Sequence, residues 1–272
     1  RTGDVVGLDT LVKVAKGVAD NCPNDEAKDQ FAIPAWLDKM IANNWLGDKT
    51  GQGFFKKIKA PNPPTGGEKE IHTLDLESME YKPRVKSKFA TIEAAKPIDD
   101  LNTRLKMLVA GQDKAGEFYR LFHYGLFSYI SHRIPEISDE LYRVDDAMMA
   151  GFGWEIGAFE SWDVLGVTKT TEAMKAAGYK VAPWVDEMIA AGNKTFYKVE
   201  NGKRLCYDVA TKTYKALPGG EAFIVMKNFE NETVWKNSAC RTYHLGDDVL
   251  GLEWYTKMGS IGGDVLSGIQ TA

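Results

Sequence analysis

Four histidines are the side chains of this 272-residue sequence best suited to acid–base or metal chemistry. They are His72, His123, His132 and His244. No two of them form a His-Glu-x-x-His pattern, which would place two ligands and a carboxylate on one helix face. His123 lies among aromatic residues, as a hydrogen-bonded core histidine does, and His132 ends a predicted helix, where a cation favours the helix dipole. We therefore predict no catalytic residue and no metal ligand.

Two glycine-rich stretches resemble phosphate-binding loops only in part. Residues 151–157 read Gly-Phe-Gly-Trp-Glu-Ile-Gly and follow a helical segment. A dinucleotide loop has a tighter glycine spacing and follows a strand, so that N–H groups at a helix start face the pyrophosphate. We expect residues 151–157 to be a close-packed turn between helices, because glycine lets backbones approach. Residues 47–51 lack the Gly-Lys-Ser/Thr end of a nucleotide-binding loop, so we predict no cofactor-binding residue.

The remaining reactive side chains form no recognisable catalytic set. Three widely spaced cysteines without a Cys-x-x-Cys pair predict packing thiols in a reducing compartment: Cys22, Cys206 and Cys240. No Gly-x-Ser-x-Gly motif occurs. The adjacent acids Asp145-Asp146 and Asp247-Asp248 are expected to point apart on a helix or to form a turn, rather than to act as an acid–base pair. Substrate-binding residues are left unassigned.

Composition restricts the class of protein. Hydrophobic residues make up 44% and charged residues 26%, as in ordinary globular domains, and the net charge is −4. These values argue against a disordered chain, a disulfide scaffold and a nucleic-acid-binding surface. No apolar run approaches the ~20 residues of a membrane helix, and no signal-peptide pattern is present, so we expect a cytoplasmic protein. Both ends look cut, which predicts an excised part of a longer protein.

The elements that would position these side chains are helical first and strand-rich last. Helical spacing runs from Asp4, a predicted N-cap, to Val18, and again after Pro34. Further helices are predicted over 99–133, 138–150 and 168–177, the last capped by Thr168. Residues 61–67, rich in proline and glycine, are the clearest linker, and residues 71–81 have a weak extended pattern.

Alternating patterns predict strands after Gly192. Asn201-Gly202 is the favoured turn of a hairpin that joins 195–199 to 204–208. A further strand is predicted over 222–229, and a second hairpin over 241–245 and 249–255. A run of helices followed by a run of strands suggests separate units.

Four short motifs occur twice, in the same order. The pairs are Asp4–Gly7 with Asp163–Gly166, Trp36–Ala42 with Trp184–Ala190, Asp48–Thr50 with Asn193–Thr195, and Phe54–Lys56 with Phe196–Lys198. The copies lie much further apart than solenoid repeats. They predict a duplicated helical domain that packs on its twin as in a homodimer. Two independent domains joined by a linker remain the alternative.

The repeated motifs resemble the C-terminal domain of 3-hydroxyacyl-CoA dehydrogenases. The resemblance rests on residues 1–9, on Trp36–Met40 and most specifically on Lys-Thr-Gly-Gln-Gly-Phe within 46–55. Residues 145–163 resemble the segment that leads into the same domain, with Glu155 and Ala158 where the family usually has prolines. That departure argues against a direct substrate role for the second copy.

Tandem copies of this domain are typical of multifunctional fatty-acid oxidation enzymes, and residues 232–272 resemble the opening of a crotonase-type enoyl-CoA hydratase domain. The resemblance implies a mainly α fold with tandem helical domains, similar to the C-terminal domain of 6-phosphogluconate dehydrogenase, and a β-rich tail. It implies a first domain over 1–60, truncated at its start, a linker over 61–98, a second domain over 99–217, and a segment over 218–272 that leads into the hydratase.

The implied parent is an oxidoreductase of β-oxidation that converts 3-hydroxyacyl-CoA and NAD to 3-oxoacyl-CoA and NADH. In the family, the NAD-binding domain and the catalytic His–Glu pair lie upstream, so the chain itself is expected to be inactive and to hold no cofactor. Its implied partners are the acyl-CoA substrate and that upstream domain. Strands cut from a partner sheet expose edges, so 232–272 is expected to be poorly ordered or to pair with another chain. The rival hypotheses are a non-catalytic helical scaffold and, less favoured, a sugar-acid dehydrogenase.

Overall fold

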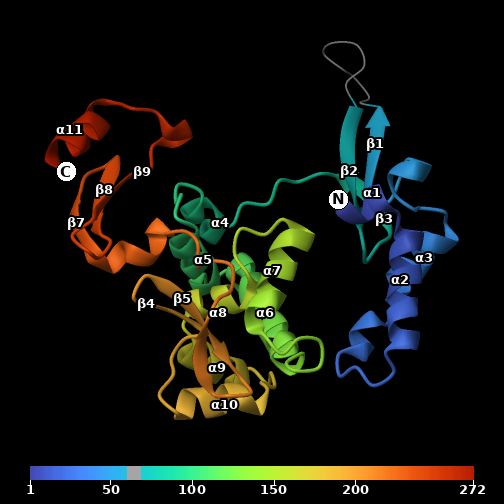
Figure 1. The fold of residues 1–272 in the computed structure, drawn as a ribbon. Coiled ribbons are helices and arrows are strands. Elements are labelled where there is room, and N and C mark those ends of the chain that lie inside the picture. Colours follow the sequence, from blue (N-terminus) through green and yellow to red (C-terminus); the bar gives the residue numbers. More distant parts are fainter. Residues whose placement is uncertain (60–68) are drawn as a thin grey trace. The chain divides into compact units, whose positions relative to one another are not determined.

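The computed structural model describes residues 1–59 and 69–272. The predicted proline-rich linker at 61–67 lies outside the described residues. The chain divides into two units, Arg1–Lys88 and Phe89–Ala272, each traced in Figure 1. None of the helices in the part of the chain that the structure describes is long and apolar enough to cross a membrane.

The first unit is a small helical cluster joined to a three-stranded sheet. Its elements are α1 (Thr2–Val6), α2 (Leu8–Asn21), η1 (Lys28–Phe31), α3 (Ala35–Ala42), η2 (Asp48–Thr50), β1 (Phe55–Lys59), β2 (Lys69–Asp75) and β3 (Glu80–Pro83). The antiparallel order is β1-β2-β3. The core takes Leu8 and Val12 from α2, Leu37 and Met40 from α3, and Leu74 from β2. Two of these strands therefore lie within 61–98, the range that the sequence assigns to a linker.

The predicted helix from Asp4 to Val18 is in fact two helices. Gly7 joins them with φ 100°, a conformation that side-chain-bearing residues rarely adopt. The prediction that Asp4 caps the helix is wrong, because Asp4 lies inside α1 and is buried. Its carboxylate binds backbone N–H groups far along the chain, as described below.

The second unit begins with seven helices and a sheet. They are α4 (Ala90–Ala95), α5 (Leu101–Ala110), α6 (Lys114–His132), α7 (Leu141–Phe152), α8 (Ala158–Leu165), α9 (Val167–Ala176) and α10 (Pro183–Ala190), followed by β4 (Tyr197–Glu200), β5 (Lys203–Asp208) and β6 (Thr213–Ala216). The antiparallel order is β4-β5-β6. Phe127 on α6 stacks on Trp162 on α8, with ring centroids 4.8 Å apart, at the centre of the core. Thr168 lies inside α9, and Gly166 precedes that helix, so Thr168 is not its cap.

The end of the second unit holds a third sheet. Its elements are η3 (Met226–Glu232), β7 (Thr233–Lys236), β8 (Cys240–His244), β9 (Leu250–Trp254), η4 (Lys257–Gly259) and α11 (Gly263–Thr271), and the antiparallel strand order is β7-β8-β9. Helix α11 lies against β8, because a Cβ atom at Gly268 would meet Cys240 Sγ at 2.0 Å.

The two predicted hairpins are confirmed. Glu200 pairs with Lys203 across a turn in which Asn201 and Gly202 both have positive φ, and β8 pairs with β9. The strand predicted over 222–229 is wrong. Its second half enters the 3-10 helix η3, since a strand propensity is realised only beside a partner strand. Phe229 instead packs its ring against Gly202.

At the coarse level the chain is helical first and carries small antiparallel sheets later, as the sequence predicts. The sheets are not confined to the tail, however, because each unit also has a sheet directly after its helices (Figure 1).

Candidate functional site

The repeated Asp-Val-Val/Leu-Gly motif forms a structural anchor in the first unit. The two carboxylate oxygens of Asp4 accept hydrogen bonds from the backbone N–H groups of Phe54 and Phe55, each at 2.9 Å. This contact ties α1 to the start of β1. We call such a buried carboxylate that binds two consecutive N–H groups an aspartate clamp.

The second unit holds the same clamp. Asp163 on α8 accepts hydrogen bonds from the N–H groups of Phe196 and Tyr197, at 2.7 and 2.8 Å. Gly166 follows with φ 87° and joins α8 to α9, as Gly7 joins α1 to α2. The motifs matched in sequence thus make matched contacts in space.

The structural correspondence between the two units extends into their sheets, beyond the four motifs that are repeated in the sequence. The hydroxyl of Tyr81 on β3 donates to the carbonyl of Gly53, and the hydroxyl of Tyr214 on β6 donates to the carbonyl of Thr195. In each unit the accepting residue directly precedes the phenylalanine at the clamp. The sequence holds only a weak sign of this correspondence. Asp75 precedes Tyr81-Lys82 by the same number of residues as Asp208 precedes Tyr214-Lys215.

Two of the three glycines of 46–55, Gly47 and Gly53, pack directly against Asp4. A Cβ atom at Gly47 would meet the backbone oxygen of Asp4 at 2.2 Å, and one at Gly53 would meet its Oδ1 at 2.3 Å. Lys49 in the same loop forms an ion pair with Asp9 on α2. The most family-specific stretch of the sequence therefore closes a loop around Asp4.

A third buried carboxylate, Asp145 on α7, binds the start of α8. It accepts hydrogen bonds from the N–H groups of Phe159 at 2.8 Å and Glu160 at 3.0 Å, and from the hydroxyl of Tyr197 at 2.9 Å. A Cβ atom at Gly157 would meet Asp145 Cγ at 2.2 Å. Residues 151–157 therefore form the predicted turn between helices, but the close packing is confined to Gly157, because Cβ atoms at Gly151 and Gly153 would meet nothing within 4 Å. The turn follows a helix and faces a carboxylate, so it does not fit a dinucleotide phosphate.

Burial dominates the electrostatics of this cluster. Burial raises the pKa of Asp145 to about 6 and that of Asp163 to about 7, because the charged carboxylates lose water. It also raises the pKa of Tyr197 far above its usual range. Burial alone would lower the pKa of Arg204, but its ion pair with Glu160 raises it. Arg204 also lies over the Tyr197 ring, 4.4 Å from the centroid.

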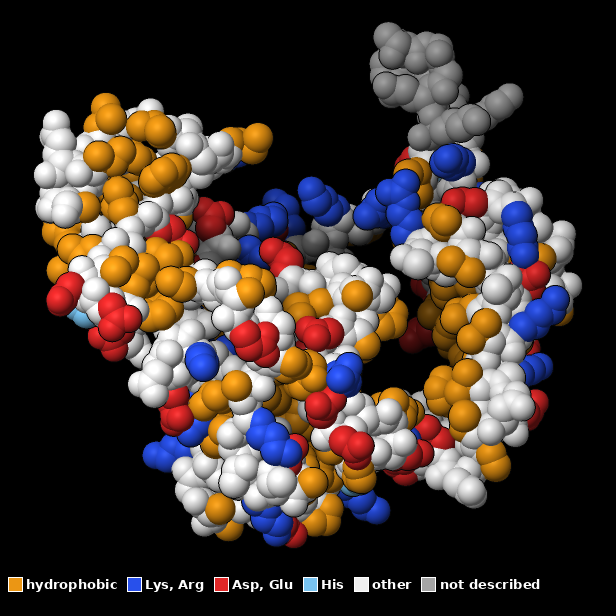
Figure 2. Space-filling model, in the orientation of Figure 1, with side chains coloured by type: hydrophobic (Ala, Val, Ile, Leu, Met, Phe, Trp, Pro, Cys, Tyr) orange, Lys and Arg blue, Asp and Glu red, His pale blue; other side chains and the backbone are white. Residues whose placement is uncertain are grey.

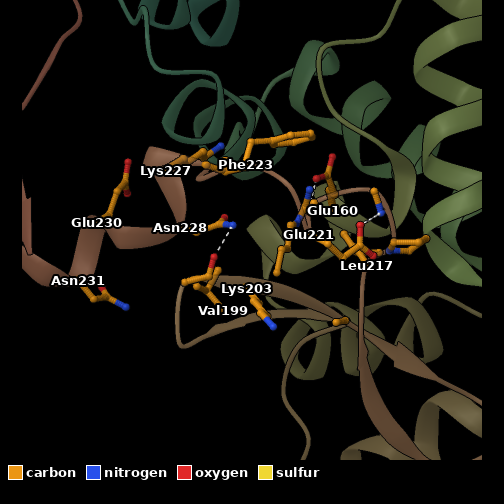
Figure 3. A pocket seen from close by; sticks show the side chains of 17 residues that line it. Glu160, Val199, Lys203, Leu217, Glu221, Phe223, Lys227, Asn228, Glu230 and Asn231 are labelled. Carbon is orange, nitrogen blue, oxygen red and sulfur yellow. Dashed lines mark hydrogen bonds and ion pairs between the residues drawn. The ribbon is translucent and has the colours of Figure 1, made fainter. Parts of the chain in front are cut away.

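A cavity of about 630 Å³ borders this cluster and is the best candidate binding site in the described part of the chain. The Glu160–Arg204 pair faces it from α8 and β5, and Val199 and Lys203 come from the β4–β5 hairpin (Figure 3). The segment 216–231 forms the other side, where Asn228 Nδ2 donates to Gly202 O at 3.1 Å. Acidic and basic side chains balance around the cavity, so its charge selects neither anions nor cations.

The histidines are divided between the two units and lie on different elements, except for two on α6. His123 and His132 lie on α6, roughly 13 Å apart by helical rise, while His72 lies on β2 and His244 on β8. His123 Nδ1 is 2.7 Å from Tyr119 O, and burial lowers the pKa of His123, as in a core histidine. Within residues 1–59 and 69–272, no group of three potential ligands gathers for a metal ion.

The cysteines are free thiols. Cys206 and Cys240 are buried, as predicted for packing thiols, and burial raises the pKa of Cys206 to about 12. Cys22 is exposed just after α2, so it does not pack in a core.

Comparison with known proteins agrees with the motifs. Residues 1–57 match the family model of the 3-hydroxyacyl-CoA dehydrogenase C-terminal domain. This stretch is therefore similar to the C-terminal domain of the 3-hydroxyacyl-CoA dehydrogenase family.

Relatives extend the similarity over nearly the whole chain. A probable 3-hydroxyacyl-CoA dehydrogenase of Bacillus subtilis is 36% identical over 98% of the chain and 32% of its own length. A putative fatty acid oxidation complex trifunctional enzyme of Rickettsia felis is 21% identical over 74% of the chain and 25% of its own length. The chain spans about a third or less of these relatives. No solved structure matches it significantly.

Proposed function

We propose that the chain is the helical, substrate-side region of an NAD-dependent 3-hydroxyacyl-CoA dehydrogenase of fatty-acid β-oxidation. The observation that carries the proposal is the similarity to the Bacillus subtilis protein over 98% of the chain. The parent enzyme removes a hydride from C3 of a 3-hydroxyacyl-CoA while a base takes the hydroxyl proton, which leaves 3-oxoacyl-CoA. NAD would supply the hydride acceptor, and no residue of this chain is proposed to hold it.

The domain proposal is a tandem pair. The first C-terminal domain begins with residues 1–60 and includes the strands β2 and β3 up to Lys88, so that the range 61–98 is not only a connection. Residues 99–217 are a second C-terminal domain of the 6-phosphogluconate-dehydrogenase type, and 218–272 a β-rich segment that leads into a crotonase-like hydratase. The shared aspartate clamp of Asp4 and Asp163 supports the pairing. On this proposal β7–β9 begin a sheet that the rest of the hydratase, or another chain, completes.

The chain's own part in the reaction is to close and shape the acyl-CoA cleft. The clamps hold the helices of each unit to its sheet. A rigid surface of this kind can hold a substrate in the orientation that the catalytic groups of another domain require. No dinucleotide step is assigned to these residues, because the turn at 151–157 does not fit a phosphate. We place the parent enzyme in the cytoplasm.

NADH formation from 3-hydroxybutyryl-CoA tests the proposal. The 272-residue chain alone should form none, and the longer natural protein should form NADH with a hyperbolic dependence on substrate. NADH formation by the isolated chain would show that it is not the inactive half of a cleft. A longer protein that leaves 3-hydroxyacyl-CoA of every chain length unoxidised would refute the dehydrogenase assignment.

A non-catalytic scaffold is the second candidate. The observation that favours it is that the polar groups of the repeated motifs, Asp4 and Asp163, are fully engaged in hydrogen bonds within the fold. Calorimetry of the longer protein with acetoacetyl-CoA separates the two. Saturable binding supports the substrate-side role, and no binding combined with no activity supports the scaffold.

A further inference from the structure

Three side chains cross the outer face of the first sheet in one row. Lys57 on β1 pairs with Ile71 on β2, and the N–H group of Arg84, just after β3, donates to the carbonyl oxygen of Ile71 at 3.3 Å. Residues that pair across antiparallel strands share one face of the sheet, and the core residue Leu74 lies on the opposite face. Ile71 is 39% exposed, and both cations are exposed as well. We call these three residues the basic row, and Figure 2 shows Lys and Arg side chains gathered at this part of the first unit.

The two cations of the basic row lack a counter-ion. Within the described residues, neither Lys57 nor Arg84 forms an ion pair. The acids of the same face, Asp75 and Glu80, pair with each other across β2 and β3, about 13 Å along the strand from the basic row. Asp75 is also neutralised by an ion pair with Lys82. The basic row therefore presents two uncompensated positive charges on strands about 10 Å apart.

An aromatic ring lies beside these charges. Phe55 stands two residues before Lys57 on β1 and so shares its face, and the guanidinium carbon of Arg84 lies 5.8 Å from the centre of the Phe55 ring. Ile71 adds an exposed apolar side chain between the cations. A nucleobase can stack on an aromatic ring or on a guanidinium plane. Phosphate groups accept charge-assisted hydrogen bonds from lysine and arginine, so a phosphorylated nucleotide matches this combination.

The corresponding row of the second unit lines a cavity. Strand register makes Val199, Arg204 and Leu217 the counterparts of the basic row, because Val199 pairs with Arg204 and the N–H group of Leu217 donates to the Arg204 carbonyl at 3.0 Å. All three line the 630 Å³ cavity, which the chain after Leu217 returns to close. Glu160 neutralises the central arginine there. In the first unit, residues 85–88 after the row are exposed, so the same sheet face is open and positively charged.

We propose that the basic row, together with Phe55, binds the 3′-phosphoadenosine diphosphate end of coenzyme A. Lys57 and Arg84 hold its phosphate groups, and the adenine lies against Phe55 and Ile71. The inference rests on the proposed function, because acyl-CoA is the phosphorylated nucleotide that the dehydrogenase reaction brings to this chain as substrate.

Calorimetric titration with adenosine 3′,5′-bisphosphate at about 0.15 M ionic strength tests the site without turnover. Saturable binding to the 272-residue chain is expected, and the double variant Lys57→Gln, Arg84→Gln should raise the Kd at least tenfold. The matched control Lys13→Gln, Lys16→Gln removes the same charge from exposed positions on α2 and should keep the original Kd. Absence of saturable binding, or an equal loss in both double variants, would overturn the proposal.

Competition distinguishes coenzyme A from other anions. Free coenzyme A should displace the bisphosphate, whereas inorganic phosphate should do so at least tenfold less effectively. Equal competition by inorganic phosphate would reduce the basic row to a general anion site and overturn the proposal. Ile71→Glu places a carboxylate between the two cations and should abolish binding, and binding that persists in this variant would contradict the assigned position.

The titration separates this inference from the proposed function, because it requires neither NAD nor dehydrogenase activity. Failure to bind the bisphosphate would remove the site and leave the outcome of the NADH assay unaffected. A longer protein that binds the bisphosphate through the basic row but oxidises no 3-hydroxyacyl-CoA would support the site and contradict the dehydrogenase assignment alone.

Discussion

Replacement of Asp4 by alanine should loosen the first unit. Asp4→Ala removes the acceptor of two backbone N–H groups, those of Phe54 and Phe55, each bonded at 2.9 Å. A buried donor left without a partner costs ~1–3 kcal/mol, so the loss of both contacts should cost about 3 kcal/mol. That free energy corresponds to roughly 100-fold faster hydrogen exchange where local opening controls the rate.

Hydrogen exchange followed by mass spectrometry measures this effect by segment. Exchange in peptides that cover β1 should accelerate in Asp4→Ala, while peptides that cover Phe196 and Tyr197 in the second unit should keep their rates and serve as an internal control. Asp20→Ala, at an exposed position on α2, is the matched variant and should change stability by less than ~0.5 kcal/mol. If β1 exchanged equally slowly in both variants, the clamp would contribute nothing to holding the strand.

Three further predictions concern the second unit. Phe127→Ala removes a fully buried ring and should lower the free energy of unfolding by ~3–5 kcal/mol in urea titrations. A loss below ~1 kcal/mol would contradict the central position of Phe127 in the core. Gly157→Ala should lower the Tm, because its Cβ would lie 2.2 Å from Asp145 Cγ. The control Gly151→Ala has open space around its Cβ and should leave the Tm unchanged or raise it. Equal Tm values for the two variants would argue against close packing at Gly157. Burial lowers the pKa of His123, so stability present above the unfolded pKa of ~6.5 should fall as the pH drops below it. His123→Phe should flatten that part of the pH profile, and parallel profiles would show that the buried imidazole does not cause it.

Local patterns in the sequence predicted much of the secondary structure. The Asn201-Gly202 turn was predictable because both residues tolerate positive φ and need no distant partner. The helices around Phe127 and Leu141 were predictable from apolar spacing, which depends only on neighbours along the chain. The similarity of residues 1–57 to the 3-hydroxyacyl-CoA dehydrogenase family was also recognisable, because the Lys-Thr-Gly-Gln-Gly-Phe stretch is specific in itself.

The roles of the acidic side chains depended on contacts between distant segments. Asp4 reads as a helix cap in the sequence, yet it binds N–H groups about fifty residues away, and Asp145 reads as half of an acidic pair, yet it anchors the turn before α8. The equivalence of the two sheets was likewise hidden, since Tyr81 and Tyr214 are recognisable as equivalent only through the carbonyls that they bind.

Short-range spacing and residue identity were sufficient to predict most of the helices, the hairpins, the resemblance to the dehydrogenase family and the repeated motifs. The role of the repeated aspartates as anchors follows from their contacts in the folded chain, where each binds two backbone N–H groups. The physical reason is that burial and hydrogen-bond partnership arise from segments far apart in the chain, and no local pattern records which of them meet.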